Sequence, residues 1–223
     1  MTDNKTTNQV LIPAGDPECY VYFDTEFTGL VKNTDLISIG LVNSNGNTFY
    51  AEFNDFDEKK VTPWINENVY PCLSYPDTTK KEGHWTITGN KEEVRKMLIE
   101  WLDTYVPKDR IIQFVSDVCH YDFVLLIDLL TNGGSALDLP RRISPCCSDI
   151  NQDIATSMYR NIPEGKTEEE FNRNFVPIAE AFNISREEIA KDYTEEIGEV
   201  KKHNALYDAK VIRAIHRNMW FSN

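Results

Sequence analysis

Positive charge is scarce in this sequence. Lys and Arg number 23 against 36 Asp and Glu, so the formal net charge is −13 with the four His residues counted as neutral. Proteins that bind nucleic acid along many phosphates are usually basic, and this composition disfavours that mode of binding. It remains compatible with an enzyme in which bound cations supply positive charge locally.

Long apolar runs are also missing. No stretch approaches the ~18 apolar residues of a membrane span, and the first 15 residues are polar, without the apolar segment of a signal peptide. The cysteines are few, odd in number and without C-x-x-C spacing, which indicates neither a disulfide framework nor a zinc site; they are Cys19, Cys72, Cys119, Cys146 and Cys147. We therefore expect a reduced, cytoplasmic protein.

The 223 residues are 41% hydrophobic and 26% charged, as in an ordinary globular protein. This length predicts one domain or at most two small ones. No internal repeat, low-complexity stretch or break in composition divides the chain. We expect a flexible N-terminal arm over 1–17 and a single domain over 18–223.

Three strands joined by tight turns open the predicted domain, over Tyr20–Phe27, Leu36–Asn43 and Thr48–Phe53. The turn Ser44-Asn45-Gly46-Asn47 is typical of a hairpin, because Asn-Gly tolerates positive φ. A further strand is expected at Ile111–Val115. Helices are expected after a cap at Asn90, with Glu93 three residues on, and over Tyr121–Leu130, Asn151–Tyr159, Thr167–Phe182 and Asn204–Met219. This order predicts an α/β fold with a mixed sheet and packed helices.

Two carboxylates lie at the end of the first predicted strand. Side chains alternate along a strand, so Asp24 and Glu26 point to the same face, about 7 Å apart. They would repel each other unless a cation lies between them, and oxygen ligands suit a divalent ion. Alternatively, both side chains face water at a frayed strand end.

Two predicted helices each begin with an Asp on the apolar stripe. Asp122 precedes Leu125, Leu126 and Leu129, and Asp208 precedes Val211, Ile212 and Ile215, in both cases at i+3, i+4 and i+7. A first-turn Asp can simply favour the helix dipole, but burying an unpaired carboxylate is costly. His203 precedes the second helix in a loop; such a histidine is more often a surface residue than a base, but it can accept a proton near neutral pH. Together these residues indicate metal-assisted hydrolysis, with two cations ~3.5–4 Å apart.

Three segments resemble the exonuclease motifs of the DEDDh 3′–5′ exonucleases, in the same order and with similar spacing. They are Asp24-Thr25-Glu26-Phe27-Thr28-Gly29-Leu30, then Tyr121-Asp122-Phe123 with Leu125 and Leu126, and His203-x-x-x-x-Asp208-Ala209. They span most of the chain. Its length, with the segments Trp64-Ile65-Asn66-Glu67-Asn68 and Asp149-Ile150-Asn151-Gln152-Asp153, is similar to that of the small bacterial and phage exoribonucleases of this family. The resemblance implies an α/β, RNase H-like fold with a mixed five-stranded sheet flanked by helices.

The same resemblance implies two Mg²⁺ or Mn²⁺ ions per site. Asp24, Glu26 and Asp208 would hold the ion that activates water, Asp24 and Asp122 the second, and His203 would be the general base. Further residues would bind the terminal nucleotide: Gly29 by letting the backbone approach, Leu30 by wedging against the base, and Thr25, Phe27 and Thr28 as pocket walls. Asp117, five residues before Asp122, is a rival for the fourth acid.

The expected substrate is the 3′ end of a single-stranded nucleic acid, RNA in preference to DNA. A DNA exonuclease of the proofreading or repair type is the alternative, and a catalytically silent member that binds nucleic acid is a third. The chain shows all the acids and the histidine, which speaks against the silent form. The resemblance also implies a homodimer, and no membrane partner is expected.

Overall fold

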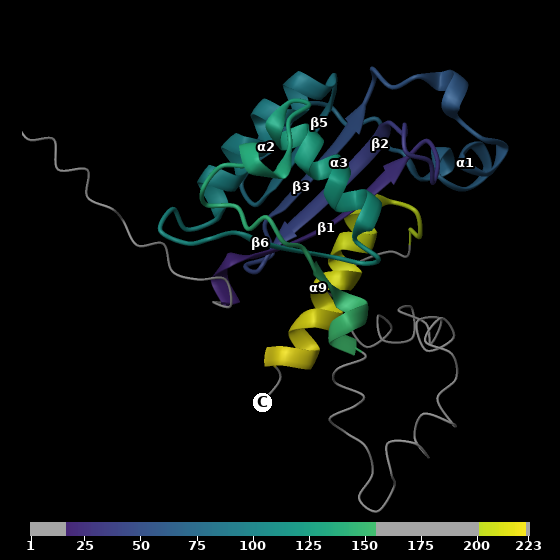
Figure 1. Ribbon diagram of the computed structural model, residues 1–223. Coiled ribbons are helices and arrows are strands. Elements are labelled where there is room, and N and C mark those ends of the chain that lie inside the picture. Colours follow the sequence, from purple (N-terminus) through teal and green to yellow (C-terminus); the bar gives the residue numbers. More distant parts are fainter. Residues whose placement is uncertain (1–16, 155–200, 222–223) are drawn as a thin grey trace, which may run out of the picture.

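A seven-stranded mixed sheet forms the centre of the computed structural model, which describes residues 17–154 and 201–221 (Figure 1). The strand order is β4-β5-β3-β2-β1-β6-β7. The strands are β1 (Tyr20–Phe27), β2 (Leu36–Asn43), β3 (Thr48–Phe53), β4 (Thr79–Lys81), β5 (His84–Gly89), β6 (Gln113–Ser116) and β7 (Ser148–Asp149). The helices are α1 (Pro63–Asn68), α2 (Lys91–Tyr105), α3 (His120–Thr131) and α9 (Ala205–Phe221).

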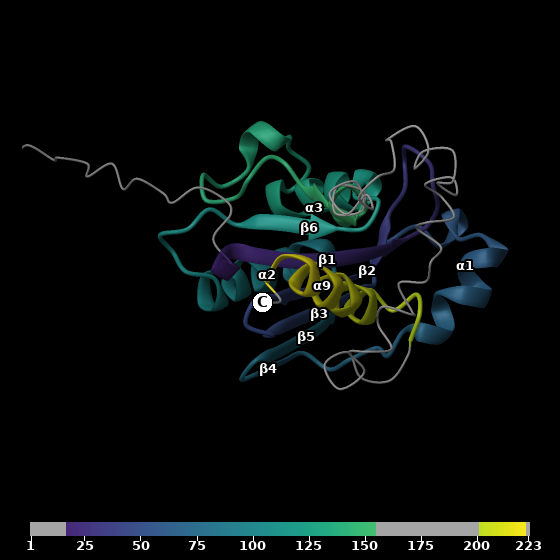
Figure 2. The same ribbon diagram turned by 90° about the horizontal axis from the view of Figure 1, so that it is seen from below.

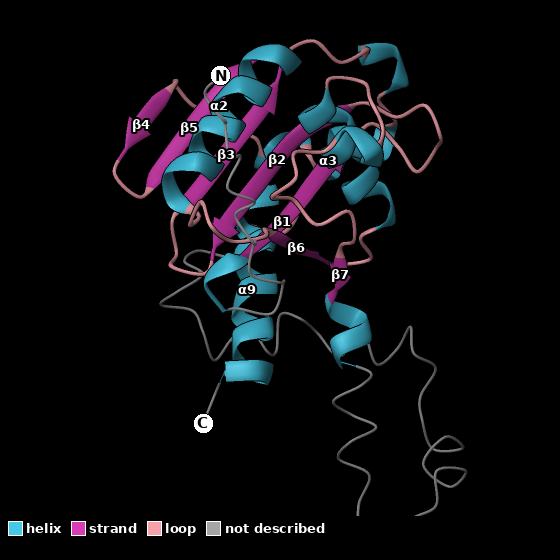
Figure 3. Cartoon of the chain, turned by 60° about the vertical axis from the view of Figure 1, so that its left-hand side comes forward, coloured by secondary structure: helices cyan, strands magenta, loops and turns pink. Residues whose placement is uncertain are grey.

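The sheet contains both antiparallel and parallel strand pairs. β1, β2 and β3 pair antiparallel, whereas β6 pairs parallel with β1 and β7 parallel with β6. On the other side, β5 pairs parallel with β3, and β4 closes the edge antiparallel to β5 (Figure 3). The expected α/β class and mixed sheet flanked by helices are confirmed.

The expected number of five strands is wrong, because the sheet continues past β3. β4 and β5 form a hairpin around Glu82 and Gly83, with Gly83 at φ +73°. Glycine readily adopts positive φ, which suits it to a two-residue turn. β4 is only three polar residues long, so the sequence shows no alternating pattern from which this hairpin could be predicted. β7, only two residues long, carries no periodicity at all.

The helices cover both faces of the sheet (Figure 2). α2 and α3 bury their apolar stripes against one face, in a core that includes Phe23, Phe49 and the fully buried Trp101. α9 covers the other face, packing against Tyr22 and Val42. No helix in the described ranges is both long and apolar enough to cross a membrane.

The first three strands have the predicted bounds, and the Asn-Gly turn joins β2 to β3 with Gly46 at φ +88°. The predicted cap of α2 is also present, since Asn90 and Glu93 satisfy each other's backbone N–H groups. The remaining elements shift by a few residues: β6 is later than predicted, α3 begins at His120, and α9 runs on to Phe221. Of the helix expected over Asn151–Tyr159, residues 151–154 are helical; Thr167–Phe182 and almost all of the expected arm lie outside the described residues.

Candidate active site

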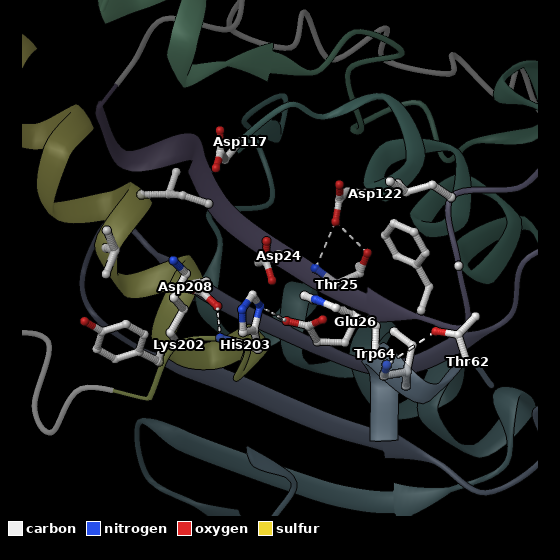
Figure 4. Close-up of a pocket in the computed structure, with 17 residues that line it drawn as sticks. Asp24, Thr25, Glu26, Thr62, Trp64, Asp117, Asp122, Lys202, His203 and Asp208 are labelled. Carbon is white, nitrogen blue, oxygen red and sulfur yellow. Dashed lines mark hydrogen bonds and ion pairs between the residues drawn. The ribbon is translucent and has the colours of Figure 1, made fainter. Parts of the chain in front are cut away.

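Three carboxylates from distant parts of the chain meet beside β1 (Figure 4). Asp24 and Glu26 come from β1, and Asp208 comes from the first turn of α9. One carboxylate oxygen of each lies within 4.8 Å of the others. The side chain of Glu26 is only 12% exposed. The structure therefore brings together three of the four predicted acids in one compact group.

Gly40 allows α9 to reach this group. It lies on β2 directly between Asp24 on β1 and Tyr50 on β3. A Cβ atom at position 40 would lie 2.2 Å from the backbone nitrogen of Leu206, so the start of α9 rests directly on the strand. A glycine inside a strand often marks such a close approach of backbone.

Asn204 caps the start of α9, as its type and position predict. Its Oδ1 accepts a hydrogen bond from the N–H of Tyr207 at 3.2 Å, and its carbonyl accepts one from Asp208 at 3.0 Å. An Asn cap satisfies N–H groups that the first turn of a helix leaves without a partner. The cap thereby fixes where the helix begins and orients Asp208 toward β1.

The clustered negative charge perturbs the pKa of Glu26. Burial, followed by the repulsion of Asp208 and Asp122, raises the pKa of Glu26 to about 9. Carboxylates placed this close favour either a proton or a cation between them. Three oxygen ligands in one group fit a hard divalent ion such as Mg²⁺, Mn²⁺ or Ca²⁺. The residues present can thus hold a metal ion.

Asp122 lies near this group but is held by different partners. It is buried at the start of α3, and its Oδ1 accepts hydrogen bonds from the N–H and hydroxyl of Thr25, at 3.0 and 2.6 Å. Burial raises the pKa of this carboxyl. Asp117 lines the same pocket and accepts a hydrogen bond from Asn151 Nδ2 at 2.7 Å. Both acids border the site, so Asp122 as the fourth acid stays a prediction.

His203 stands beside the carboxylates in an unusual backbone conformation, with φ at +65°. Its N–H donates to Asp208 Oδ2 at 3.0 Å, and its Nδ1 lies 4.0 Å from Glu26 Oε1. The ring meets Trp64 edge-on, with 5.1 Å between ring centroids. Burial, followed by the charge of Lys202, lowers the pKa of His203. A lowered pKa favours the neutral imidazole, the form that is able to accept a proton.

The carboxylates and His203 border an open pocket of about 640 Å³. Phe27, Gly29 and Leu30 line it as expected, and Leu30 is 74% exposed. A Cβ atom at Gly29 would meet nothing within 4 Å, which leaves room for a ligand. Thr25 also lines the pocket, although its hydroxyl is engaged by Asp122.

Thr28 does not form the expected pocket wall. It is buried, and its hydroxyl oxygen accepts a hydrogen bond from the N–H of Asp35 at 3.0 Å. The register of β1 against β2 already shifts between Glu26 and Phe27, and Thr28 follows the end of β1, where it is hydrogen-bonded to Asp35 in the loop that connects to β2. Its role is to shape the loop behind Gly29 and Leu30.

Trp64 was not among the predicted site residues, yet it lines the pocket beside His203 (Figure 4). It follows Pro63, the first residue of α1, which Thr62 caps by accepting a hydrogen bond from Ile65 at 3.4 Å. Thr-Pro is a recognisable helix start, so the sequence carried a signal for α1. Nothing in the sequence indicated that α1 reaches the site.

The chain is thus an α/β protein in which three clustered carboxylates lie beside a histidine. No protein-family model matches the sequence. The chain is 36% identical over 55 residues to the 3′-5′ exoribonuclease Rv2179c of Mycobacterium tuberculosis strain ATCC 25618 / H37Rv. The 3′-5′ exoribonuclease MT2234.1 of strain CDC 1551 / Oshkosh matches equally. The match covers 25% of this chain and 33% of each relative, so the chain spans about a third of the length of the curated relatives it matches.

Solved structures show more distant likeness. The Mg²⁺- and Mn²⁺-bound form of S. pombe Pop2p is 17% identical, with a TM-score of 0.45 over 92% of this chain and 84% of that one. The RNase domain of yeast Pop2 is 15% identical, with a TM-score of 0.47 over 90% of this chain and 77% of that one. The chemistry of the site accordingly rests on this chain's own residues.

Proposed function

We propose that this protein is a metal-dependent 3′–5′ exoribonuclease. The observation that carries the proposal is the group formed by Asp24, Glu26 and Asp208, with His203 beside it in an open pocket. Hydrolysis of a phosphodiester needs positive charge at the phosphate and a group that takes a proton from water. This site offers ligands for the first and a neutral imidazole for the second.

Each residue has a role in this proposal. Asp24, Glu26 and Asp208 would hold one divalent ion, and Asp24 with Asp122 would support a second. When bound, the ions supply Lewis-acid stabilisation of the attacking and leaving oxygens. His203 accepts the proton of the attacking water, because its lowered pKa keeps it neutral. Thr25 orients Asp122 through its N–H and hydroxyl.

The substrate in this proposal is the 3′-terminal nucleotide of a single strand. Phe27, Leu30 and Trp64 line the pocket and give it apolar surfaces suited to a base. The matching M. tuberculosis proteins are named 3′-5′ exoribonucleases, which favours RNA over DNA. The net charge of −13 fits a short footprint with few phosphate contacts and therefore a weak dependence on salt.

The test uses two single strands of one base sequence, RNA and DNA, each labelled at the 5′ end. Each is incubated with Mg²⁺, with EDTA, and with the variant Asp24→Ala. The proposal expects a ladder of shortened RNA products that requires Mg²⁺ and disappears with the variant. Faster shortening of DNA would instead identify a DNA exonuclease. No shortening of either strand by folded protein, with Mg²⁺ or Mn²⁺, would overturn the proposal and leave a binding protein.

A further inference from the structure

A buried carboxylate outside the site described above links β3 to the 74–75 segment. Glu52 is 1% exposed, and its oxygens accept hydrogen bonds from Tyr50, Ser74 and Tyr75, with Ser74 donating through both its N–H and, at 3.4 Å, its hydroxyl. The hydroxyl of Tyr50 donates at 2.7 Å, and the N–H groups of Ser74 and Tyr75 donate at 2.7 and 2.9 Å. A buried carboxylate is costly unless hydrogen-bonded, and here the donors come from both β3 and the 74–75 segment.

The hydroxyl of Tyr50 continues this chain of hydrogen bonds to the start of α9. It donates to Glu52 and accepts from Asn204 Nδ2 at 3.3 Å. Asn204 Nδ2 also donates to the carbonyl oxygen of Cys72 at 3.0 Å, and Cys72 Sγ lies 3.1 Å from the carbonyl oxygen of Lys202. The turn at 202–204 is thus tied to β3 and to the 72–75 segment, on both sides of His203.

The sheet places these residues in register with the metal-binding group. Asp24, Gly40 and Tyr50 form one row across β1, β2 and β3, and Glu26, Ser38 and Glu52 form the next. The start of α9 rests on Gly40, between Asp24 and Tyr50. Tyr50 and Asn204 therefore hold this end of α9 from the side opposite Asp24.

The conformation of His203 requires such support. A positive φ is unfavourable for a residue with a Cβ and persists where the surroundings impose it. The N–H of His203 is committed to Asp208, and Asn204 supplies the helix cap that sets the position of Asp208. An error of about 1 Å in placing such groups can lower a reaction rate by roughly a hundredfold.

We propose that Tyr50 and Glu52 are positioning residues that fix the His203–Asn204 turn relative to the metal-binding carboxylates. This inference rests on the proposed function. Neither residue lines the pocket formed around the carboxylates. Both act through Asn204, so their loss should affect the placement of His203 and leave substrate binding nearly unchanged.

The test compares Tyr50→Phe with a matched control, Tyr105→Phe. Tyr50→Phe removes only the hydroxyl that links Glu52 to Asn204. Tyr105→Phe removes a hydroxyl that accepts a hydrogen bond from the N–H of Gly83, in the turn between β4 and β5. We expect Tyr50→Phe to lower kcat on RNA by about tenfold or more while KM changes by less than about twofold. Asn204→Ser keeps a capping oxygen but loses the amide donor, and should reproduce this pattern. Unchanged kcat in Tyr50→Phe, or a loss that the control shares, would overturn the inference.

A second readout does not depend on activity. The ring signals of the four histidines are followed by NMR, with His203 assigned by its loss in His203→Gln. We expect Tyr50→Phe to move the His203 signal and leave those of His84, His120 and His216 in place. An unmoved His203 signal would overturn the positioning role. Absence of exonuclease activity in the wild-type protein would overturn the proposed function alone, because the NMR comparison would still decide the positioning role.

Discussion

The contact between Gly40 and α9 makes a precise prediction for Gly40→Ala. The added Cβ would lie 2.2 Å from the nitrogen of Leu206 and 2.3 Å from the carbonyl carbon of Ala205. Both are backbone atoms, which no side-chain rotation can move away. Ordinary contacts begin near 3.5 Å, so the start of α9 must move away by roughly 1 Å. Asp208, three residues beyond Ala205, moves with it.

Two effects follow from this displacement. Overpacking of this kind costs about 1–3 kcal/mol of unfolding free energy, which urea denaturation measures. Misplacement of Asp208 by about 1 Å should lower metal-dependent activity roughly a hundredfold. Gly29→Ala is the matched control for stability, because its Cβ meets nothing within 4 Å and its φ is ordinary. Wild-type stability and activity in Gly40→Ala would refute the packing that brings Asp208 to β1.

Three further predictions concern charge and burial. Asp24→Asn should stabilise the metal-free protein, because it reduces repulsion among the clustered carboxylates. It should also remove most of the stabilisation by Mg²⁺, which for the wild type is about 2.7 kcal/mol when the Mg²⁺ concentration is 100 times Kd. Equal Mg²⁺ stabilisation in both proteins would contradict this. Burial lowers the pKa of His216 to about 4 in the folded protein, whereas the pKa of a histidine in the unfolded chain is near 6.5. Between pH 4 and 6.5, His216 therefore binds more protons in the unfolded chain than in the folded protein. The unfolding free energy should then fall by about 3 kcal/mol as pH drops from 6.5 to 4. The variant His216→Gln should lose this pH dependence when unfolding is measured by urea denaturation. An unchanged pH dependence in the variant would count against a neutral buried histidine. Thr25→Val removes the 2.6 Å hydrogen bond to Asp122 and should lower the unfolding free energy by about 1–3 kcal/mol. Thr25→Ser keeps the hydroxyl and should not. Equal unfolding free energies for the two variants would contradict the role of that bond.

Local signals accounted for the central strands and for α2. β1 to β3 are dense in β-branched and aromatic residues, and an Asn-Gly turn joins β2 to β3, so propensity and turn chemistry agree. In α2, the capping box and the apolar stripe agree in the same way. The acidic residues could be found because each carboxylate interrupts an otherwise apolar pattern.

The features that escaped prediction depend on contacts between distant segments. Glu52 looks like a solvent-facing residue of β3, because its donors at Ser74 and Tyr75 approach only in the folded chain. Trp64 reaches the pocket through the placement of α1, which no local pattern encodes. Gly40 did carry a signal, since glycine is disfavoured inside a strand, but the helix that rests on it begins 165 residues later at Ala205.

The metal-binding role of the three carboxylates is the central claim, and diffraction from crystals soaked in Mn²⁺ tests it most directly. The anomalous signal of manganese locates the ion without reference to activity. The account predicts a peak among the oxygens of Asp24, Glu26 and Asp208, and its loss in Asp208→Asn crystals. No peak there, or one unaffected by that substitution, would contradict a metal centre at this site.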